Sequence, residues 1–264
     1  MGDDAKDLLV TDSNLVVTDS IPLYSFDGKR IPKPIKADLE AMSIVQDGDQ
    51  FRLLLVGSGS LSPYRNTGWL IDPLTKHAVS IRLDSFYQRL KTPGLDVINI
   101  EGVCSIPGSV ILANRGNNAW RKNDLILTSE GFWKDQSLSP ITIIRMGANT
   151  DSTVFNGVSG LAYADKSDQL LLTVSTENTS SNTGDGAIGR SYLWIVKNIS
   201  SKKNWKIINP DEIIDFEKLD QRFKGQKIES VCVMDETKNF LHLVLAADND
   251  DGSSSIFKLI VEKK

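Results

Sequence analysis

The fold is decided by a short stretch, NIEGVC at residues 99–104, whose pattern recurs three more times along the chain. The copies are DLEAMS at residues 38–43, VSGLA at 158–162 and KIESVC at 227–232. Each copy places small or branched apolar residues after a polar position, which is typical of a short strand in a crowded place. An internal repeat with an interval of about 60 residues indicates an architecture in which one supersecondary unit recurs.

The residues that follow each copy complete a repeating unit. A second apolar strand ends in a polar cluster, such as GSGS at residues 57–60 or NRGN at 114–117, and a third, amphipathic strand comes next. Residues 8–26 carry a compressed copy, so the chain holds five units of about 53 residues, near the ~40–50 of a propeller blade. We therefore predict one all-β domain over residues 1–264, a five-bladed β-propeller, with six blades as the alternative.

The sequence also gives expectations for the closure of the ring, the helical segments and the two cysteines. The C-terminal unit supplies three strands, and its fourth is expected from the N-terminal residues, which would close the ring. Helix is expected only as one or two turns near residues 84–90 and 210–220. Cys104 and Cys232 are expected to be small buried side chains rather than a redox pair. A β-sandwich is the rival fold, but it does not predict the same order of strands and polar clusters four times.

The composition is that of an ordinary globular protein, with 40% hydrophobic and 24% charged residues. A net charge of −4 without a long run of Lys or Arg argues against a nucleic-acid partner. The longest apolar stretches are far shorter than the roughly 20 residues of a membrane helix. Two cysteines exclude a disulfide framework, and two histidines argue against a His-rich zinc site. Residues 1–7 do not form a signal peptide, although a removed leader is compatible with the Met-Gly start.

Residues at the same position of each repeat are far apart in the sequence, but a propeller places them around one axis. The innermost strand of each blade lines the central channel, so Glu40, Glu101 and Glu229 are expected near one mouth at equivalent heights. Carboxylates gathered around one axis repel each other, and they need a cation, Arg or Lys neighbours, or raised pKa values. The clusters after the second strands place three more charged residues at comparable positions, namely Arg115, Glu177 and Asp248.

Three interpretations of this ring stay open. In the first, the carboxylates hold a hard cation such as Ca²⁺, which takes 6–8 oxygen ligands. In the second, an anionic ligand binds through bidentate Arg contacts that the carboxylates keep in place. In the third, each Glu accepts hydrogen bonds from backbone N–H groups of the next blade and holds that blade in position. The metal ligands would be Glu40, Glu101, Glu229 and Asp248, and the ligand-binding residues Arg115, Arg65, Glu177 and Asn117.

Several polar stretches together fit the pattern of a known kind of propeller. They are the motif copies at residues 38–41, 99–102 and 227–230, the clusters at 55–60, 114–117 and 247–251, and residues 185–191. They resemble an uncharacterised bacterial β-propeller family that is similar to the phytase-like propellers. The resemblance covers the chain from about Lys36 onward. Related groups include calcium-dependent esterases, lactonases and phytases, which implies Ca²⁺ in the channel and a periplasmic or secreted location. Two residues depart from the pattern: Ser159 stands where the motif has Glu, and Ser230 stands where it usually has Gly.

Two functional hypotheses from different classes follow. The first is a binding or scaffold protein whose polar channel mouth takes a small ligand or a divalent cation. The alternative, implied by the resemblance, is a phytase-like Ca²⁺-dependent hydrolase of a phosphate or carboxylic ester. No catalytic residue is assigned, and whether the protein is an enzyme is left open. We expect a monomer without a transmembrane segment or a nucleic-acid partner, and a cytoplasmic location is the alternative to a periplasmic or secreted one.

Overall fold

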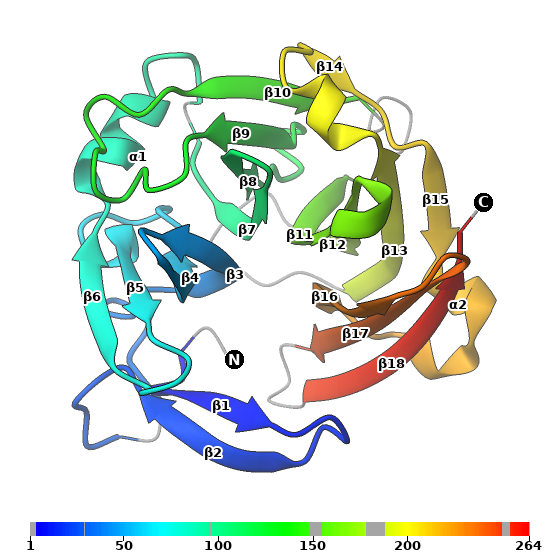
Figure 1. The fold of residues 1–264 in the computed structure, drawn as a ribbon, viewed down its shortest axis with the longest axis horizontal. Coiled ribbons are helices and arrows are strands. Elements are labelled where there is room, and N and C mark those ends of the chain that lie inside the picture. Colours follow the sequence, from blue (N-terminus) through cyan, green and yellow to red (C-terminus); the bar gives the residue numbers. More distant parts are fainter. Residues whose placement is uncertain are drawn as a thin grey trace.

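The strands of this protein stand around a central axis. The structure is a computed structural model, and it describes residues 4–28, 30–95, 97–147, 155–177, 188–249 and 254–263. Most regular elements in these ranges are β-strands, and their sheets are arranged like the blades of a propeller (Figure 1). The prediction of an all-β, propeller-like fold is therefore confirmed.

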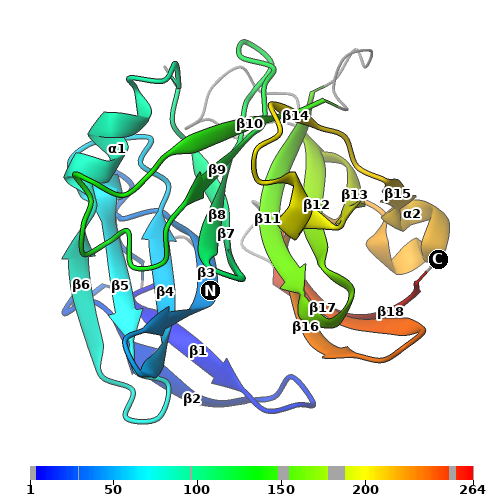
Figure 2. The same cartoon turned by 45° about the horizontal axis from the view of Figure 1, so that its top comes forward.

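Four meanders form the blades, and the first strand of each lies innermost (Figures 1 and 2). The short strand β14 (Ile207–Ile208) pairs in parallel with the last strand of the second blade, although it comes from a later connection. The other strands are, blade by blade, β3 (Leu39–Asp47), β4 (Gln50–Gly57), β5 (Thr67–Ile71) and β6 (Ala78–Arg82); β7 (Ile100–Ile106), β8 (Ser109–Asn114), β9 (Asp124–Thr128) and β10 (Thr142–Met146); β11 (Asn156–Ala164), β12 (Gln169–Glu177), β13 (Ile188–Lys197) and β15 (Glu212–Asp215); and β16 (Ile228–Glu236), β17 (Phe240–Asp248) and β18 (Ser254–Glu262).

The N-terminal residues form a hairpin rather than a blade. In the described chain β1 (Asp7–Thr11) and β2 (Val17–Pro22) pair only with each other. The prediction of five blades, with six as the alternative, is therefore wrong, because the structure has four blades and a two-stranded hairpin. Pro32 and Pro34 follow the hairpin, and proline cannot donate a hydrogen bond to a further strand of a ladder.

The predicted closure of the ring is also wrong, because β1 does not extend the sheet of the fourth blade. Buried apolar clusters join the hairpin to the first blade, the first blade to the second, the second to the third and the third to the fourth. Among the described residues no such cluster joins the fourth blade to the first. Lys258 Nζ on β18 reaches the hairpin instead and donates to the Ser13 carbonyl at 2.6 Å.

The inner strands on either side of this junction expose apolar side chains. Met42 on β3 and Met234 on β16 are about half exposed, whereas the inner strand β7 of the second blade is almost fully buried. Cys104 on β7 is buried as predicted, but the prediction for Cys232 on β16 is wrong, because its side chain is exposed. An inner strand is buried only where a neighbouring inner strand packs against it.

Glycines allow the inner strands of the middle blades to approach closely. A Cβ atom on Gly102 would lie 2.9 Å from the backbone nitrogen of Leu161, and one on Gly160 would lie 2.7 Å from the carbonyl oxygen of Glu229. Ser230 occupies the same repeat position on β16, and it is exposed. The departure from glycine at position 230 is therefore explained by the missing neighbour of β16.

Replacing Gly102 with alanine should lower the free energy of unfolding by about 1–3 kcal/mol, because the new methyl group overpacks the contact between β7 and β11. The matched control is Ser230→Ala at the equivalent, exposed position, where we expect a change within about 0.5 kcal/mol. Urea denaturation followed by tryptophan fluorescence measures both. Equal stability of the two variants would contradict the close packing of the inner strands.

Helical segments are short, as predicted. Helix α1 (Asp84–Leu90) buries Phe86, Tyr87 and Leu90 in the apolar cluster between the first two blades, and α2 (Phe216–Leu219) is a single turn beside β13. No helix in the described ranges is long and apolar enough to cross a membrane. The remaining helical turns are η1 (Tyr64–Asn66), η2 (Asp165–Ser167), η3 (Ile199–Lys202) and η4 (Gln221–Phe223).

Candidate functional site

The sequence repeat is a repeated β-bulge. In each blade the pairing between the two inner strands skips one residue near its start, and these skipped residues are Glu40, Glu101, Ser159 and Glu229. A bulge adds an unpaired residue to one strand and redirects its side chain. The structure therefore confirms that these positions are equivalent in the repeat, and it gives the physical reason: the motif encodes the bulge.

Two of the bulged carboxylates meet basic groups at the centre of the molecule. Glu101 Oε2 lies 3.6 Å from Arg115 Nη1, and the Asn99 side-chain amide donates to Glu101 Oε1 at 2.5 Å. Lys227 Nζ lies 3.0 Å from Glu229 Oε1. The side chains of Glu101, Arg115 and Lys227 are about 10% exposed, whereas that of Glu229 is 25% exposed. Glu229 is thus the most accessible charged group of the four.

The environment of Glu229 favours its protonated form. Burial raises the pKa of this carboxyl, and the nearby Glu101 carboxylate raises it further. The charges of Lys227 and Arg115 lower the pKa, and the net value is about 7. Lys227 contacts Oε1, and Oε2 has no hydrogen-bond partner in the described part of the chain. Glu229 therefore offers a carboxyl oxygen without a partner among the described residues, on a group whose pKa is raised toward neutral pH.

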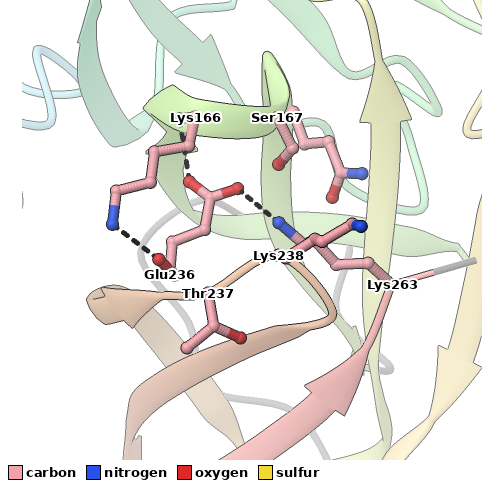
Figure 3. A pocket seen from close by; sticks show the side chains of 7 residues that line it. Lys166, Ser167, Glu236, Thr237, Lys238 and Lys263 are labelled. Atoms are coloured by element: carbon pink, nitrogen blue, oxygen red, sulfur yellow. Dashed lines mark hydrogen bonds and ion pairs between the residues drawn. The ribbon is translucent and has the colours of Figure 1, made fainter.

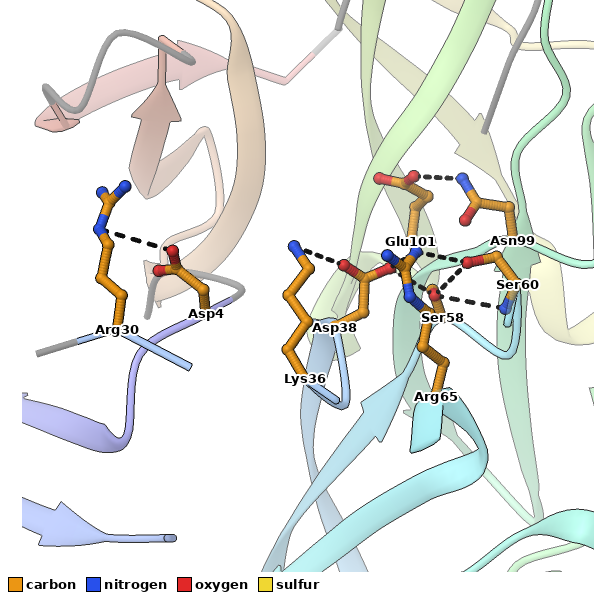
Figure 4. Close-up of polar contacts among 9 residues, drawn as sticks. All are labelled: Asp4, Arg30, Lys36, Asp38, Ser58, Ser60, Arg65, Asn99 and Glu101. Carbon is orange, nitrogen blue, oxygen red and sulfur yellow. Dashed lines mark hydrogen bonds and ion pairs between the residues drawn. The ribbon is translucent and has the colours of Figure 1, made fainter. Parts of the chain in front are cut away.

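A second buried charge cluster lies in the first blade (Figure 4). The carboxylate of Asp38 contacts Lys36 Nζ at 2.8 Å and also pairs with the guanidinium of Arg65. Ser58 Oγ donates to Asp38 Oδ2 at 2.6 Å, and Arg65 Nη1 donates to Ser60 Oγ at 2.7 Å. The three charged residues are at most 7% exposed, so the Asp38 carboxylate compensates part of the charge of the two cations away from water.

Hydrogen bonds next to the bulges join neighbouring blades. Ser159, which replaces the motif Glu, donates from Oγ to the Ile228 carbonyl of the fourth blade at 2.8 Å. The backbone N–H of Ile100 in the second blade donates to the Ser58 carbonyl of the first at 2.8 Å. Ser159 therefore joins the third blade to the fourth as a hydrogen-bond donor, whereas the interpretation that each Glu accepts from the next blade stays a prediction. Glu229 contacts Lys227, a lysine of its own blade, instead of a neighbouring blade.

The predicted ligand-binding residues are divided among different places. Arg115 lies in the central cluster, and Arg65 lies in the buried cluster of the first blade. Asn117 forms a turn, because its side-chain oxygen accepts the backbone N–H groups of Ala119 and Trp120 at 2.9 and 2.8 Å. Glu177 ends β12, and its side chain lies outside the described part of the chain. Of the three whose side chains the structure describes, Arg115 is the one whose charge acts on Glu229.

The predicted metal ligands do not form a ligand set. Glu101 and Glu229 are close to one another, Glu40 is half-buried at the bulge of the first blade, and Asp248 ends β17. No three His, Cys, Asp or Glu side chains in the described ranges are placed to hold a metal ion. Lys227 and Arg115 lie beside the two central carboxylates, so cationic side chains already occupy part of the space around them.

Sequence reasoning missed Asp38 as a site residue, although this residue bridges Lys36 and Arg65. A signal for it exists, because Asp38 is the first residue of the motif copy in the first blade; its φ is 57°, which Asp and Asn tolerate better than most residues. The sequence pattern drew attention to the glutamate at the bulge, and the position two residues earlier holds Asn99, Gly157 and Lys227 in the other copies.

Comparison with known proteins identifies a family but no activity. A family model described as "Family of unknown function (DUF6929)" matches residues 1–261 of the chain. No curated protein matches the sequence. Neither finding supports the resemblance to phytase-like propellers, so the calcium ion, the hydrolase and the periplasmic or secreted location that it implied stay predictions.

Proposed function

We propose that this chain, which belongs to the family of unknown function DUF6929, is a binding protein whose ligand site surrounds Glu229 at the centre of the propeller. The observation that carries the proposal is a partly accessible carboxyl with one free oxygen and a pKa raised to about 7. A strongly shifted pKa beside specific charge partners is typical of functional sites. A role in joining neighbouring blades does not require a carboxyl with a raised pKa, since Ser159 joins two blades through a neutral hydroxyl.

The ligand chemistry follows from which groups are accessible. Arg115 and Lys227 are the more deeply buried members of the central cluster, and Glu229 is the more exposed one. A ligand that enters the centre therefore meets a carboxyl oxygen before it meets a cation. We expect a small molecule with hydrogen-bond donors, either an amine or a polyol, and we expect its binding to need no chemical step. An amine would bind the ionised form of Glu229 and would displace its proton.

The proposal is tested by ligand-observed NMR with a fixed panel of small amines, polyols and carboxylic acids. Amines or polyols should bind the wild-type protein, and Glu229→Gln should weaken the binding of amines by about ten-fold, because the substitution removes the negative charge. Amine binding should also tighten between pH 6 and pH 8 in the wild-type protein, as the carboxyl ionises.

The matched control is Glu130→Gln, since Glu130 is exposed and forms no ion pair within the described chain. This variant should bind the panel as the wild type does. The proposal fails if Glu229→Gln binds the same compounds with unchanged affinity, or if only carboxylic acids bind.

A further inference from the structure

A second polar site lies at the opposite end of the third and fourth blades. A groove of about 730 Å³ is lined by residues of η2, of the turn that follows β16 and of the C-terminal end of β18. Glu229 is the second residue of β16 and Glu236 is the last, so at ~3.3 Å per residue the two glutamates are about 20 Å apart along the strand. The groove is therefore separate from the site around Glu229.

A buried glutamate organises the wall of this groove (Figure 3). Glu236 is 5% exposed, and its two carboxylate oxygens accept from the backbone N–H of Lys166 at 2.9 Å and from Lys263 Nζ at 3.0 Å. Lys166 Nζ also donates to the Glu236 carbonyl at 2.6 Å. Burial alone would raise the pKa of Glu236, but contacts with Ser167, Lys263 and Lys166 lower it below its usual value. Glu236 therefore stays ionised and holds two lysines at the groove.

The groove keeps an excess of positive charge. Lys166, Lys238 and Lys263 line it, and Glu236 is the acidic residue among the lining side chains. Lys238 is exposed and has no partner among the described residues. The side chain of Gln169 is 6% exposed, lines the same groove and makes no hydrogen bond within the described chain. An unpaired ammonium and an unsatisfied amide thus face the same space, next to lysines that are already fixed.

We propose that this groove between the third and fourth blades binds a small soluble phosphate anion. Lysine ammonium groups bind phosphate oxygens as point charges, and Lys238 supplies a charge that no described residue neutralises. The Gln169 amide supplies a hydrogen-bond donor from a buried position. The volume lies within the ~300–1,000 Å³ of small-molecule sites, and it exceeds what a single inorganic phosphate fills. A ligand with two phosphate groups therefore fits the groove better than one with a single phosphate.

Calorimetric titration with pyrophosphate tests this assignment. The wild-type protein should bind pyrophosphate more tightly than inorganic phosphate, and more weakly as the salt concentration rises. Lys238→Gln should weaken pyrophosphate binding by about five- to ten-fold, and Lys238→Glu should abolish it. Lys91→Gln is the matched control, since Lys91 is also exposed and has no side-chain partner in the described chain. Thermal unfolding of each variant checks that the fold is kept.

Three outcomes would overturn the proposal. If titration with pyrophosphate gives no heat at low salt, the protein has no such site. If the Lys238→Gln and Lys91→Gln proteins bind pyrophosphate with equal affinity, the site does not lie in this groove. Vesicles that carry an anionic phospholipid form the third arm of the experiment. If these vesicles bind the protein through Lys238 while pyrophosphate does not, the groove recognises a membrane surface rather than a soluble anion.

Discussion

Replacing Asp38 with asparagine should lower the free energy of unfolding by about 3–5 kcal/mol, because removing one partner leaves buried charges uncompensated. Asp38 neutralises Lys36 and Arg65, and all three side chains are less than 10% exposed. Asparagine keeps the shape of the side chain and tolerates the φ of 57° at this position, so the substitution removes the charge without adding backbone strain. Ser58 would also lose the charged acceptor of its hydrogen bond.

Urea denaturation of the Asp38→Asn protein measures this effect, and Asp49→Asn provides the control. Asp49 lies in the exposed turn between β3 and β4 and has no partner among the described residues. Its substitution should change the free energy of unfolding by no more than about 0.5 kcal/mol. A loss of less than about 1 kcal/mol in the Asp38→Asn protein would mean that water reaches Lys36 and Arg65 and that the cluster is not closed.

The repeat could be recognised from the sequence because one local structure recurs. Glu40, Glu101, Ser159 and Glu229 align since each is the extra residue of a bulge, and a bulge needs a particular short pattern. The number of blades could not be obtained in the same way. Residues 8–26 have the apolar alternation of strands, but whether two strands become a blade or a hairpin depends on what later residues pair with them.

The contacts of the site depend on packing between blades, which the sequence pattern does not contain. Glu101, Glu229 and Arg115 interact with one another in the structure, but the pattern treated all carboxylates as equivalent. The structure makes them different: Glu101 is nearly buried beside Arg115, and Glu229 keeps a free oxygen. Ser230 is the clearest case, because its departure from glycine has meaning only once the open junction beside β16 is known.

Stability should fall as the pH rises from about 4.5 to about 7, and Glu229 should cause this fall. The folded protein raises the pKa of this carboxyl from 4.5 to about 7, so in this range the folded state binds a proton that the unfolded state has released. That proton stabilises the fold at low pH, and the contribution is lost as the pH passes the folded pKa. The shift corresponds to about 2–3 kcal/mol at pH 8 relative to pH 4, with allowance for the partial exposure of the group.

Glu229→Gln should remove this pH dependence, because glutamine resembles the protonated carboxyl at every pH. The variant should equal the wild type in stability near pH 4 and exceed it by about 2–3 kcal/mol at pH 8. Urea denaturation at a series of pH values gives the difference between the two proteins, and subtraction cancels the other titrating groups. Glu130→Gln should stay parallel to the wild type throughout. If the difference between wild type and Glu229→Gln is constant across the range, the carboxyl is ionised at neutral pH, and the central site loses the property on which its proposed role depends.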